Sequence, residues 1–172
     1  MKRTLAPGAE VVTATKTVVI GLGNPYLGDD GVGVQVIRAL ADRLRGRDSV
    51  TVTELPAGGL RLMEAMVGCQ RAFVVDAVRT GRKPPGTVMW LLLEDLELSL
   101  HCACSHDTSL GWALESGRRL GLDLPAEISV LGIEAARFDT FGEPMSPEVA
   151  GAVAKAERAL LREIGRGANS DR

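Results

Sequence analysis

At 172 residues, the chain is long enough to bury one hydrophobic core and too short for two comfortable domains. Its 20 basic and 22 acidic residues nearly cancel, which argues against a broad basic surface for nucleic acid or an anionic membrane. With two Trp, one Tyr and three Phe, the chain also has too few aromatic residues for a base-stacking platform.

The sequence has neither the composition of a membrane span nor that of an export signal. Apolar runs stay short of the roughly 18 to 20 residues needed to cross a bilayer. The N-terminal segment MKRTLAPGAEVVTATK is basic at its start but has no apolar stretch behind it. Three cysteines are an odd number and do not suggest a disulfide framework. We therefore expect a cytoplasmic protein with free thiols.

Short apolar runs that are typical of buried strands alternate with amphipathic segments. TVVIGL (17–22) predicts the first strand, SVTVTEL (49–55) the second and RAFVVDAV (71–78) the third. Residues 60–66 predict a short helix that ends near Gly68. A longer helix is predicted after the first strand by apolar residues at helical spacing, namely Val34, Ile37, Leu40, Ala41 and Leu44.

The second half of the chain continues this alternation. TVMWLLLEDL (87–96) and EISVLGIE (127–134) predict two more strands. A helix is expected over about 107–120, where an Asp-Thr pair supplies good N-cap residues. The closing helix is expected over 146–164, with a serine as N-cap, a proline at the first helical position and a glutamate in the first turn.

This order of elements predicts an α/β fold, a three-layer α/β/α sandwich around a mostly parallel, mixed and twisted sheet of about five strands. We expect a single domain over 1–172 with its core at about 17–165. Residues 1–15 and 166–172 are expected to be peripheral.

Three polar features are expected at one edge of this sheet, because sites in open α/β sheets form beyond the carboxyl ends of the strands. They are the loop GLGNPYLGDDGVG (21–33), Asp76 at the end of the apolar run AFVVD, and His106 just before a helix. Two carboxylates and an imidazole from separate segments form a borderline ligand set for Zn²⁺ or Ni²⁺. Three protein ligands would leave one position open.

Each of these residues also has a simpler interpretation. Asp29 or Asp30 can cap the helix that follows, as an isolated aspartate pair often does. Asp76 can start a turn, although a carboxylate that follows Phe-Val-Val needs a hydrogen-bond or charge partner. His106 alone is more typical of a surface or helix-start position than of a metal ligand.

The glycine-rich loop does not fit the nucleotide-binding patterns. Tyr26 stands where the third glycine of G-x-G-x-x-G belongs, and no G-K-[ST] follows for a Walker loop. Two consecutive aspartates at a helix start would also repel a pyrophosphate.

The segment HCACSH (101–106) concentrates both histidines and two of the three cysteines. Three interpretations stay open: a thiolate-rich metal site formed by Cys102, Cys104 and His106, a Cys–His hydrolase, and a C-x-C redox pair. Each lacks a usual component, namely a fourth ligand, an orienting third group, or the C-x-x-C spacing. We favour His106 as the functional residue of this segment and the two cysteines as bystanders.

The chain resembles the hydrogenase maturation proteases at GLGNPYLGDDGVG, at VVDAV and at the Ser-His pair before a helix, and the resemblance extends from about 17 to 164. These endopeptidases trim the C-terminus of the large subunit of [NiFe] hydrogenases. The resemblance implies a mixed-sheet α/β/α sandwich and a metal-binding, catalytic set of Asp30, Asp76 and His106. LPAGGL (55–60) and VLGIE (130–134) are also similar to family segments. We take as substrate-loop candidates Gly23, Asn24, Gly58 and Gly59.

The resemblance also implies a function and a partner. The family protease acts on a large-subunit precursor only after nickel has been inserted, and its ligands are expected to recognise that nickel in the substrate. Zinc or another divalent ion is an alternative occupant in the isolated protein. A metal-activated water with Asp30 or Asp76 as base is a reasonable cleavage chemistry. No nucleic-acid or membrane partner is expected.

Two other functions stay open from the sequence. A nickel-dependent checkpoint or docking protein would use the same three ligands without cleaving the precursor. The opening GLGNP, with a tyrosine after it, also resembles peptidyl-tRNA hydrolase, but that enzyme needs a histidine soon after the loop and a basic groove for tRNA. No histidine occurs before position 101.

Overall fold

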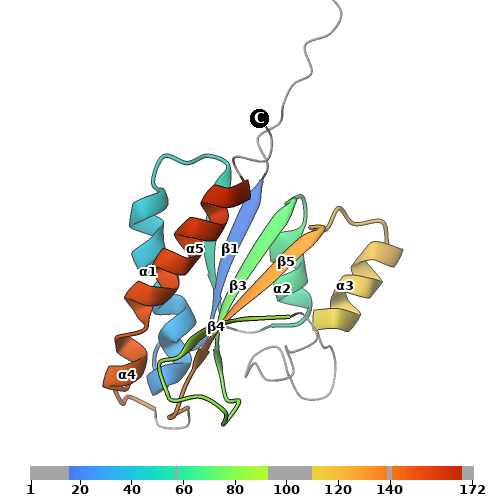
Figure 1. Cartoon of the computed structure of the whole chain (residues 1–172). Helices are drawn as coiled ribbons and strands as arrows, with labels where there is room; N and C mark the ends of the chain where they lie inside the picture. The colour runs from blue at the N-terminus through green and yellow to red at the C-terminus, as the bar shows by residue number, and fades with distance from the viewer. Residues whose placement is uncertain (1–15, 57, 93–109, 139–140, 168–172) are drawn as a thin grey trace, which may run out of the picture.

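The structure is a computed structural model that describes residues 16–56, 58–92, 110–138 and 141–167. Its centre is a five-stranded sheet in the order β2-β1-β3-β5-β4 (Figure 1). β1, β2, β3 and β5 run parallel, and β4 pairs antiparallel with β5 at one edge. The predicted mixed, mostly parallel sheet is therefore confirmed. The strands are β1 Thr17–Leu22, β2 Val50–Leu55, β3 Arg71–Val78, β4 Val88–Leu91 and β5 Glu127–Glu134.

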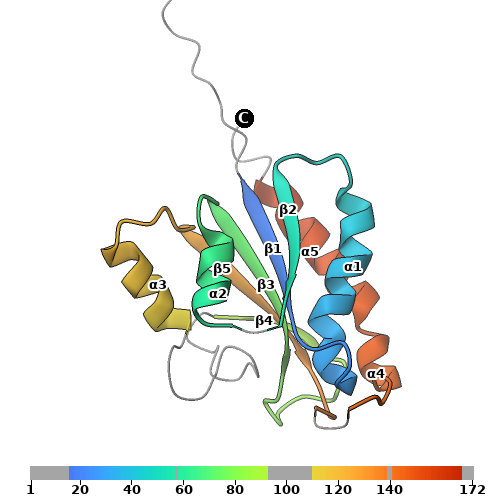
Figure 2. The same ribbon diagram turned by 180° about the vertical axis from the view of Figure 1, so that it is seen from behind.

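Helices cover both faces of the sheet (Figures 1 and 2). One face carries α1 (Val32–Leu44), α4 (Pro147–Ala150) and α5 (Val153–Gly167), and the other carries α2 (Leu60–Met66) and α3 (Leu110–Arg119). Of the helices that the structure describes, none is long and apolar enough to cross a membrane. The three-layer α/β/α arrangement predicted from the sequence is confirmed.

Alternating side chains of β3 enter the two hydrophobic cores on either side of the sheet. Phe73, Val75 and Ala77 pack in the core beneath α1 and α5, whereas Ala72 and Val74 pack in the core beneath α2 and α3. Since successive side chains of a strand point to opposite faces, Asp76 lies on the face of α2 and α3. A strand buried on both faces explains why its sequence reads as a continuous apolar run.

The closing segment differs from the single helix predicted over 146–164. It forms the short helix α4 and then α5, with a turn at Gly151 and Ala152 between them. The turn is closed by a hydrogen bond from the Ala152 N–H to the Val149 carbonyl, 3.0 Å long. Glycine lowers helix stability by about 1 kcal/mol relative to alanine, which makes Gly151 a favourable place for this break. The predicted start of α3, and the ends 1–15 and 168–172, lie outside the described residues.

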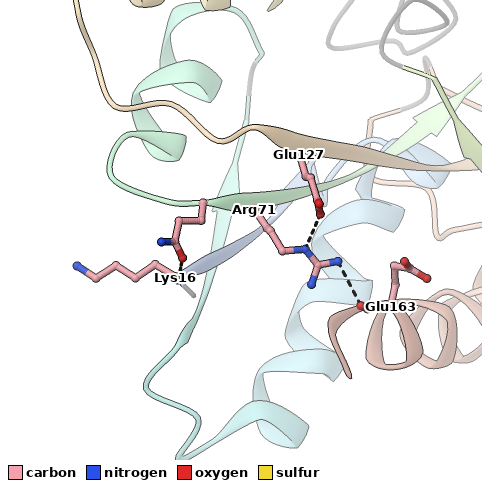
Figure 3. A network of polar contacts seen from close by, with 5 residues as sticks. Lys16, Arg71, Glu127 and Glu163 are labelled. Atoms are coloured by element: carbon pink, nitrogen blue, oxygen red, sulfur yellow. Dashed lines mark hydrogen bonds and ion pairs between the residues drawn. The ribbon is translucent and has the colours of Figure 1, made fainter. Parts of the chain in front are cut away.

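A polar network ties the amino edge of the sheet to the last helix (Figure 3). The Arg71 guanidinium donates to Glu127 Oε2 at 2.9 Å and to the Glu163 carbonyl at 3.4 Å, and so links β3, β5 and α5. The same guanidinium lies over the Phe73 ring, 5.1 Å from its centroid. These contacts stabilise the edge opposite the polar features described next.

Candidate functional site at the carboxyl edge of the sheet

The loop from β1 to α1 lies in close contact with the carboxyl ends of β1 and β3. A Cβ atom added to Gly33 would strike the carbonyl oxygens of Leu22 and Val75, and one added to Gly23 would strike the carbonyl of Asp30. Gly23 also has a φ of 133°, which L side chains rarely adopt. Glycine at these positions lets the start of α1 approach the ends of both strands.

Asp30 is held in a defined position within this loop. It belongs to the 3-10 turn η1 (Gly28–Gly31), is only 5% exposed, and accepts a hydrogen bond from the Asn24 N–H to Oδ2 at 2.7 Å. Asn24 in turn accepts from the Tyr26 N–H through its side-chain oxygen (3.0 Å) and from the Leu27 N–H through its carbonyl (3.0 Å). Asn24 therefore organises the loop and orients the Asp30 carboxylate.

Asp76 reaches the same edge from β3. It is fully buried, and its partner in the register with β5 is Gly132. The pairing of β3 with β1 ends one residue earlier, at Gly21 and Val75. η1, which holds Asp30, contacts β3. The structure thus brings the two predicted carboxylates to the point where β1 and β3 end their pairing.

The third predicted ligand, His106, lies outside the described residues, as do Cys102 and Cys104. Within the described ranges, no three His, Cys, Asp or Glu side chains come together in a way that could hold a metal ion. The three-ligand site therefore remains a prediction, with two of its members placed. The three interpretations of HCACSH also remain open.

Asp29, which sequence reasoning left as a possible helix cap, has a different role. The residue at the N-cap of α1 is Gly31, and that of η1 is Leu27. The buried Asp29 carboxylate instead accepts from the N–H groups of Ser146 (2.7 Å), Ala136 (3.0 Å) and Arg137 (3.0 Å). Its own N–H donates to the Arg137 carbonyl at 3.0 Å. Asp29 therefore fastens the loop between β5 and α4 to the site loop.

These contacts also set the charge state of Asp29. Burial by itself raises the pKa of the carboxyl group, because it disfavours the ionised form. The backbone hydrogen bonds from Ser146, Ala136 and Arg137 favour the ionised form, and together they bring the pKa below its ordinary value. Asp29 is therefore a buried anion at neutral pH.

Another buried acid, Glu134, holds the turn between β3 and β4. Glu134 is the last residue of β5 and accepts from the Thr80 N–H (3.0 Å), the Thr80 hydroxyl (2.6 Å) and the Gly81 N–H (2.8 Å). Sequence reasoning did not single it out. The signal was present, since Glu134 follows a buried apolar strand just as Asp76 follows Phe-Val-Val.

The four predicted substrate-loop residues lie on two adjoining loops. The Gly23 N–H donates to the Leu55 carbonyl at 3.2 Å, which joins the loop after β1 to the loop after β2. In the second loop, Gly59 has a φ of 65° and stands at the N-cap of α2, where its carbonyl accepts from the Met63 N–H at 3.1 Å. Gly58 is partly exposed beside it. Their contact with a substrate stays a prediction.

Comparison with known proteins identifies the family. Residues 34–163 match the family model of the hydrogenase maturation proteases. The chain belongs to the hydrogenase maturation protease family. The resemblance seen in the sequence, and the expectation of a protease, are thereby confirmed.

Relatives and solved structures agree with this assignment. The hydrogenase 2 maturation protease of Escherichia coli K12 is 27% identical over 119 residues, which cover 69% of this chain and 72% of that protein. The hydrogenase expression/formation protein HupD of Rhizobium leguminosarum bv. viciae is 26% identical over 155 residues, 88% and 75% of the two chains. The [NiFe] hydrogenase maturation protease HybD from Thermococcus kodakarensis superposes with a TM-score of 0.67 and 27% identity, covering 86% of this chain and 97% of that one. The maturating endopeptidase HybD of E. coli shares the fold. It superposes with a TM-score of 0.70 at 20% identity, covering 88% of this chain and 93% of that chain.

In this hydrogenase maturation protease, the described part of the site contains carboxylate oxygens that are buried from solvent. The two carboxylates lie on different elements and are both buried, so their charges interact in a medium of low dielectric constant. Buried carboxylates are stabilised by hydrogen bonds, as from Asn24 to Asp30, or by a cation. Two buried carboxylates at one edge of the sheet are therefore the chemically distinctive feature of the described site.

Proposed function

We propose that this protein is a nickel-dependent endopeptidase that removes the C-terminal extension of a [NiFe] hydrogenase large-subunit precursor after nickel insertion. The observation that carries the proposal is the pair of buried carboxylates, Asp30 and Asp76, at one edge of the sheet in a hydrogenase maturation protease. The name of the Thermococcus kodakarensis protein, a [NiFe] hydrogenase maturation protease, supports the same class of substrate. We place this step in the cytoplasm, in keeping with the free thiol of Cys69.

Nickel belongs to the substrate in this proposal, and Asp30, Asp76 and His106 are its ligands on the protease. Carboxylate oxygen and imidazole nitrogen are suitable ligands for Ni²⁺ and for Zn²⁺, so zinc or another divalent ion is expected to occupy the site in the isolated protein. The hydrogen bond from the Asn24 N–H to Asp30 supports this role, because such outer contacts orient a ligand before the metal arrives.

Recognition of nickel makes cleavage a geometric checkpoint. A precursor whose nickel is held by the three ligands presents its C-terminal segment in a fixed position beside the site, whereas a precursor without nickel is not held there. We propose that a water molecule attacks the carbonyl carbon of the scissile peptide bond and that Asp30 or Asp76 accepts a proton from it. The same carboxyl group then returns the proton to the departing amine as the C–N bond breaks. Gly23, Asn24, Gly58 and Gly59 lie on the loops that would border the bound segment.

The test is incubation of the purified protein with a nickel-loaded large-subunit precursor, followed by mass spectrometry of the precursor C-terminus. We expect a shortened C-terminus with nickel-loaded precursor and an intact one with nickel-free precursor. An intact tail under conditions where the two proteins bind would contradict the proposal and identify a checkpoint protein that does not cleave.

A further inference from the structure

The turn between β3 and β4 is strongly basic. Its sequence, RTGRKPPG (79–86), contains Arg79, Arg82 and Lys83 and no acidic residue, although the whole chain has a net charge of −2. All three side chains belong to exposed residues. The turn therefore creates a local positive potential on a protein that is slightly acidic overall.

Within the described part of the chain, no acidic side chain forms an ion pair with these cations, and the Glu134 carboxylate meets only Thr80 and Gly81 of the turn. Arg82 and Lys83 have no ion-pair partner there, and Arg79 lies over the Phe138 ring at 4.3 Å from its centroid, a contact that keeps its charge. Elsewhere on the surface, Arg38 pairs with Glu54 at 2.9 Å and is an example of a neutralised arginine. The charge of the turn is therefore available to a partner.

The turn is also held in one conformation. Glu134 receives hydrogen bonds from the Thr80 N–H, the Thr80 hydroxyl and the Gly81 N–H, and the Thr80 hydroxyl oxygen accepts from the Arg82 N–H at 3.1 Å. At the other end, the Thr87 hydroxyl donates to the Pro84 carbonyl at 2.7 Å. Because this backbone is ordered before a partner arrives, binding through the turn loses less conformational entropy.

The position of the turn connects it with the proposed cleavage site. It follows β3 directly, and Asp76 lies in the same strand. In Figure 1 the green segment between β3 and β4 projects beyond the end of the sheet where β1, β3 and β5 finish. A polypeptide that reaches Asp30 and Asp76 therefore arrives at the edge from which this basic turn projects.

We propose that the β3–β4 turn is a docking contact for an acidic segment of the polypeptide substrate. The inference rests on the proposed function and adds a recognition element outside the nickel ligands. Charge complementarity favours an acidic protein surface. A nucleic acid is disfavoured, because three cations make a small footprint and the rest of the chain carries a net negative charge. Attraction of this kind accelerates association and lowers KM, whereas it leaves the chemical step unchanged.

The test compares two double variants of the full chain with the same change of charge. Arg82→Glu/Lys83→Glu reverses the charge of the turn. Arg158→Glu/Arg162→Glu is the control, at two exposed positions of α5 that form no ion pair within the described residues. Binding of nickel-loaded precursor is measured by biolayer interferometry at low and high ionic strength, and processing is measured as KM and kcat. We expect the turn variant to bind about tenfold more weakly at low salt, with a raised KM, an unchanged kcat and little remaining dependence on salt. The control should stay within about twofold of the unaltered protein.

Four other results would count against the docking contact, the protease proposal or both. Equal KM and equal salt dependence for the turn variant and the control would overturn the inference while leaving the proposed function intact. Salt-dependent binding without cleavage, lost in the turn variant, would support the docking contact and contradict the protease proposal. Failure of the unaltered protein to bind the precursor would overturn both. An RNA oligonucleotide retained by the unaltered protein and lost by the turn variant, with precursor binding unchanged, would assign the turn to nucleic acid instead.

Discussion

Two neighbouring aspartates in one turn serve different purposes. Asp29 accepts hydrogen bonds from N–H groups of the loop between β5 and α4, whereas Asp30 accepts one from the Asn24 N–H within its own loop. The sequence predicted that one of the pair would be a ligand, and the family pattern selected Asp30. It did not reveal the role of Asp29, because Asp29 and Ser146 are separated by 117 positions.

Substitution of Asp29 by asparagine should destabilise the fold. Asparagine replaces one carboxylate oxygen by an NH2 group, which faces a backbone N–H and cannot accept its hydrogen bond. Asp29→Asn should therefore lower the free energy of unfolding by about 2 kcal/mol. Asp42→Asn is the control, since Asp42 is exposed and forms an ion pair with Arg45 on the surface, and it should change stability by less than about 0.5 kcal/mol. Urea unfolding measures both, and equal midpoints would contradict the assigned role.

The loss of stability in Asp29→Asn should also depend on pH in a defined direction. The folded pKa of Asp29 lies below the ordinary value, so its stabilisation is complete above about pH 4 and is lost as the pH falls through the folded pKa. The difference between the unaltered protein and Asp29→Asn should therefore shrink in acid, as unfolding curves of the isolated protein recorded between neutral and acid pH would show. A difference that grew in acid would mean that Asp29 is protonated in the folded protein.

The proposed ligands make a separate prediction. Asp30→Asn, Asp76→Asn and His106→Ala should each abolish nickel-dependent processing, with at least about a hundredfold loss, because each removes a ligand of the metal that positions the substrate. Cys102→Ser and Cys104→Ser should process normally. Mass spectrometry of the precursor gives the readout and circular dichroism verifies the fold. Equal damage from the cysteine variants would assign the site to the thiolate-rich interpretation of HCACSH.

At the scale of elements, buried strands were the most predictable part of the chain. The ranges predicted for β1, β3 and β5 are those observed. β1 and β3 are buried along almost their whole length and β5 over residues 130–134, so an apolar run marks each strand. The break between α4 and α5 was missed, since periodicity continues through Gly151 and only packing reveals the turn. The apolar residues before Glu134 indicate a buried carboxylate, but its partners in the turn at Thr80 and Gly81, more than 50 positions away, do not follow from the sequence.

The two ends of β5 allow a matched test of Glu134. Glu134→Gln should lower the free energy of unfolding by about 1 to 2 kcal/mol, because an amide cannot accept all three hydrogen bonds from Thr80 and Gly81. Glu127→Gln makes the same change at the exposed start of the strand, where the amide oxygen can still accept from Arg71, and should cost less than about 0.5 kcal/mol. Hydrogen exchange at the Thr80 and Gly81 amides should accelerate in the first variant alone. Unchanged exchange would show that Glu134 does not hold the turn.

At the scale of the whole molecule, the layered fold and the location of the site followed from topology. Alternating elements predict a parallel sheet, and a parallel sheet brings the carboxyl ends of its strands to one edge, where Asp30 and Asp76 are found. The interlocking of the edge loops did not follow, because it depends on hydrogen bonds between segments far apart in the chain. Topology therefore located the site, and tertiary packing determines how it is held.

Helix α1 packs too close to the sheet at Gly33 to leave room for a side chain there. Gly33→Ala places a methyl group against the backbone of Leu22 and Val75, so α1 must move outward and the free energy of unfolding should fall by about 3 kcal/mol or more. Gly165→Ala, in α5 with open space around the added methyl group, should stabilise the protein by about 0.5 to 1 kcal/mol. Thermal unfolding compares the two, and a neutral Gly33→Ala would disprove this close packing.

The hydrogen bond from the Ser146 N–H to Asp29 has a consequence for when the site can form during synthesis. It joins the first loop of the fold to a residue near the start of the last helical segment, 117 positions later. Contacts of such wide separation form late, because a long loop of chain must first be closed. A growing chain therefore carries Asp30 and Asp76 long before the loop that secures the neighbouring Asp29 exists. Under the proposed function, a partly synthesised protease has no completed site with which to act on a precursor.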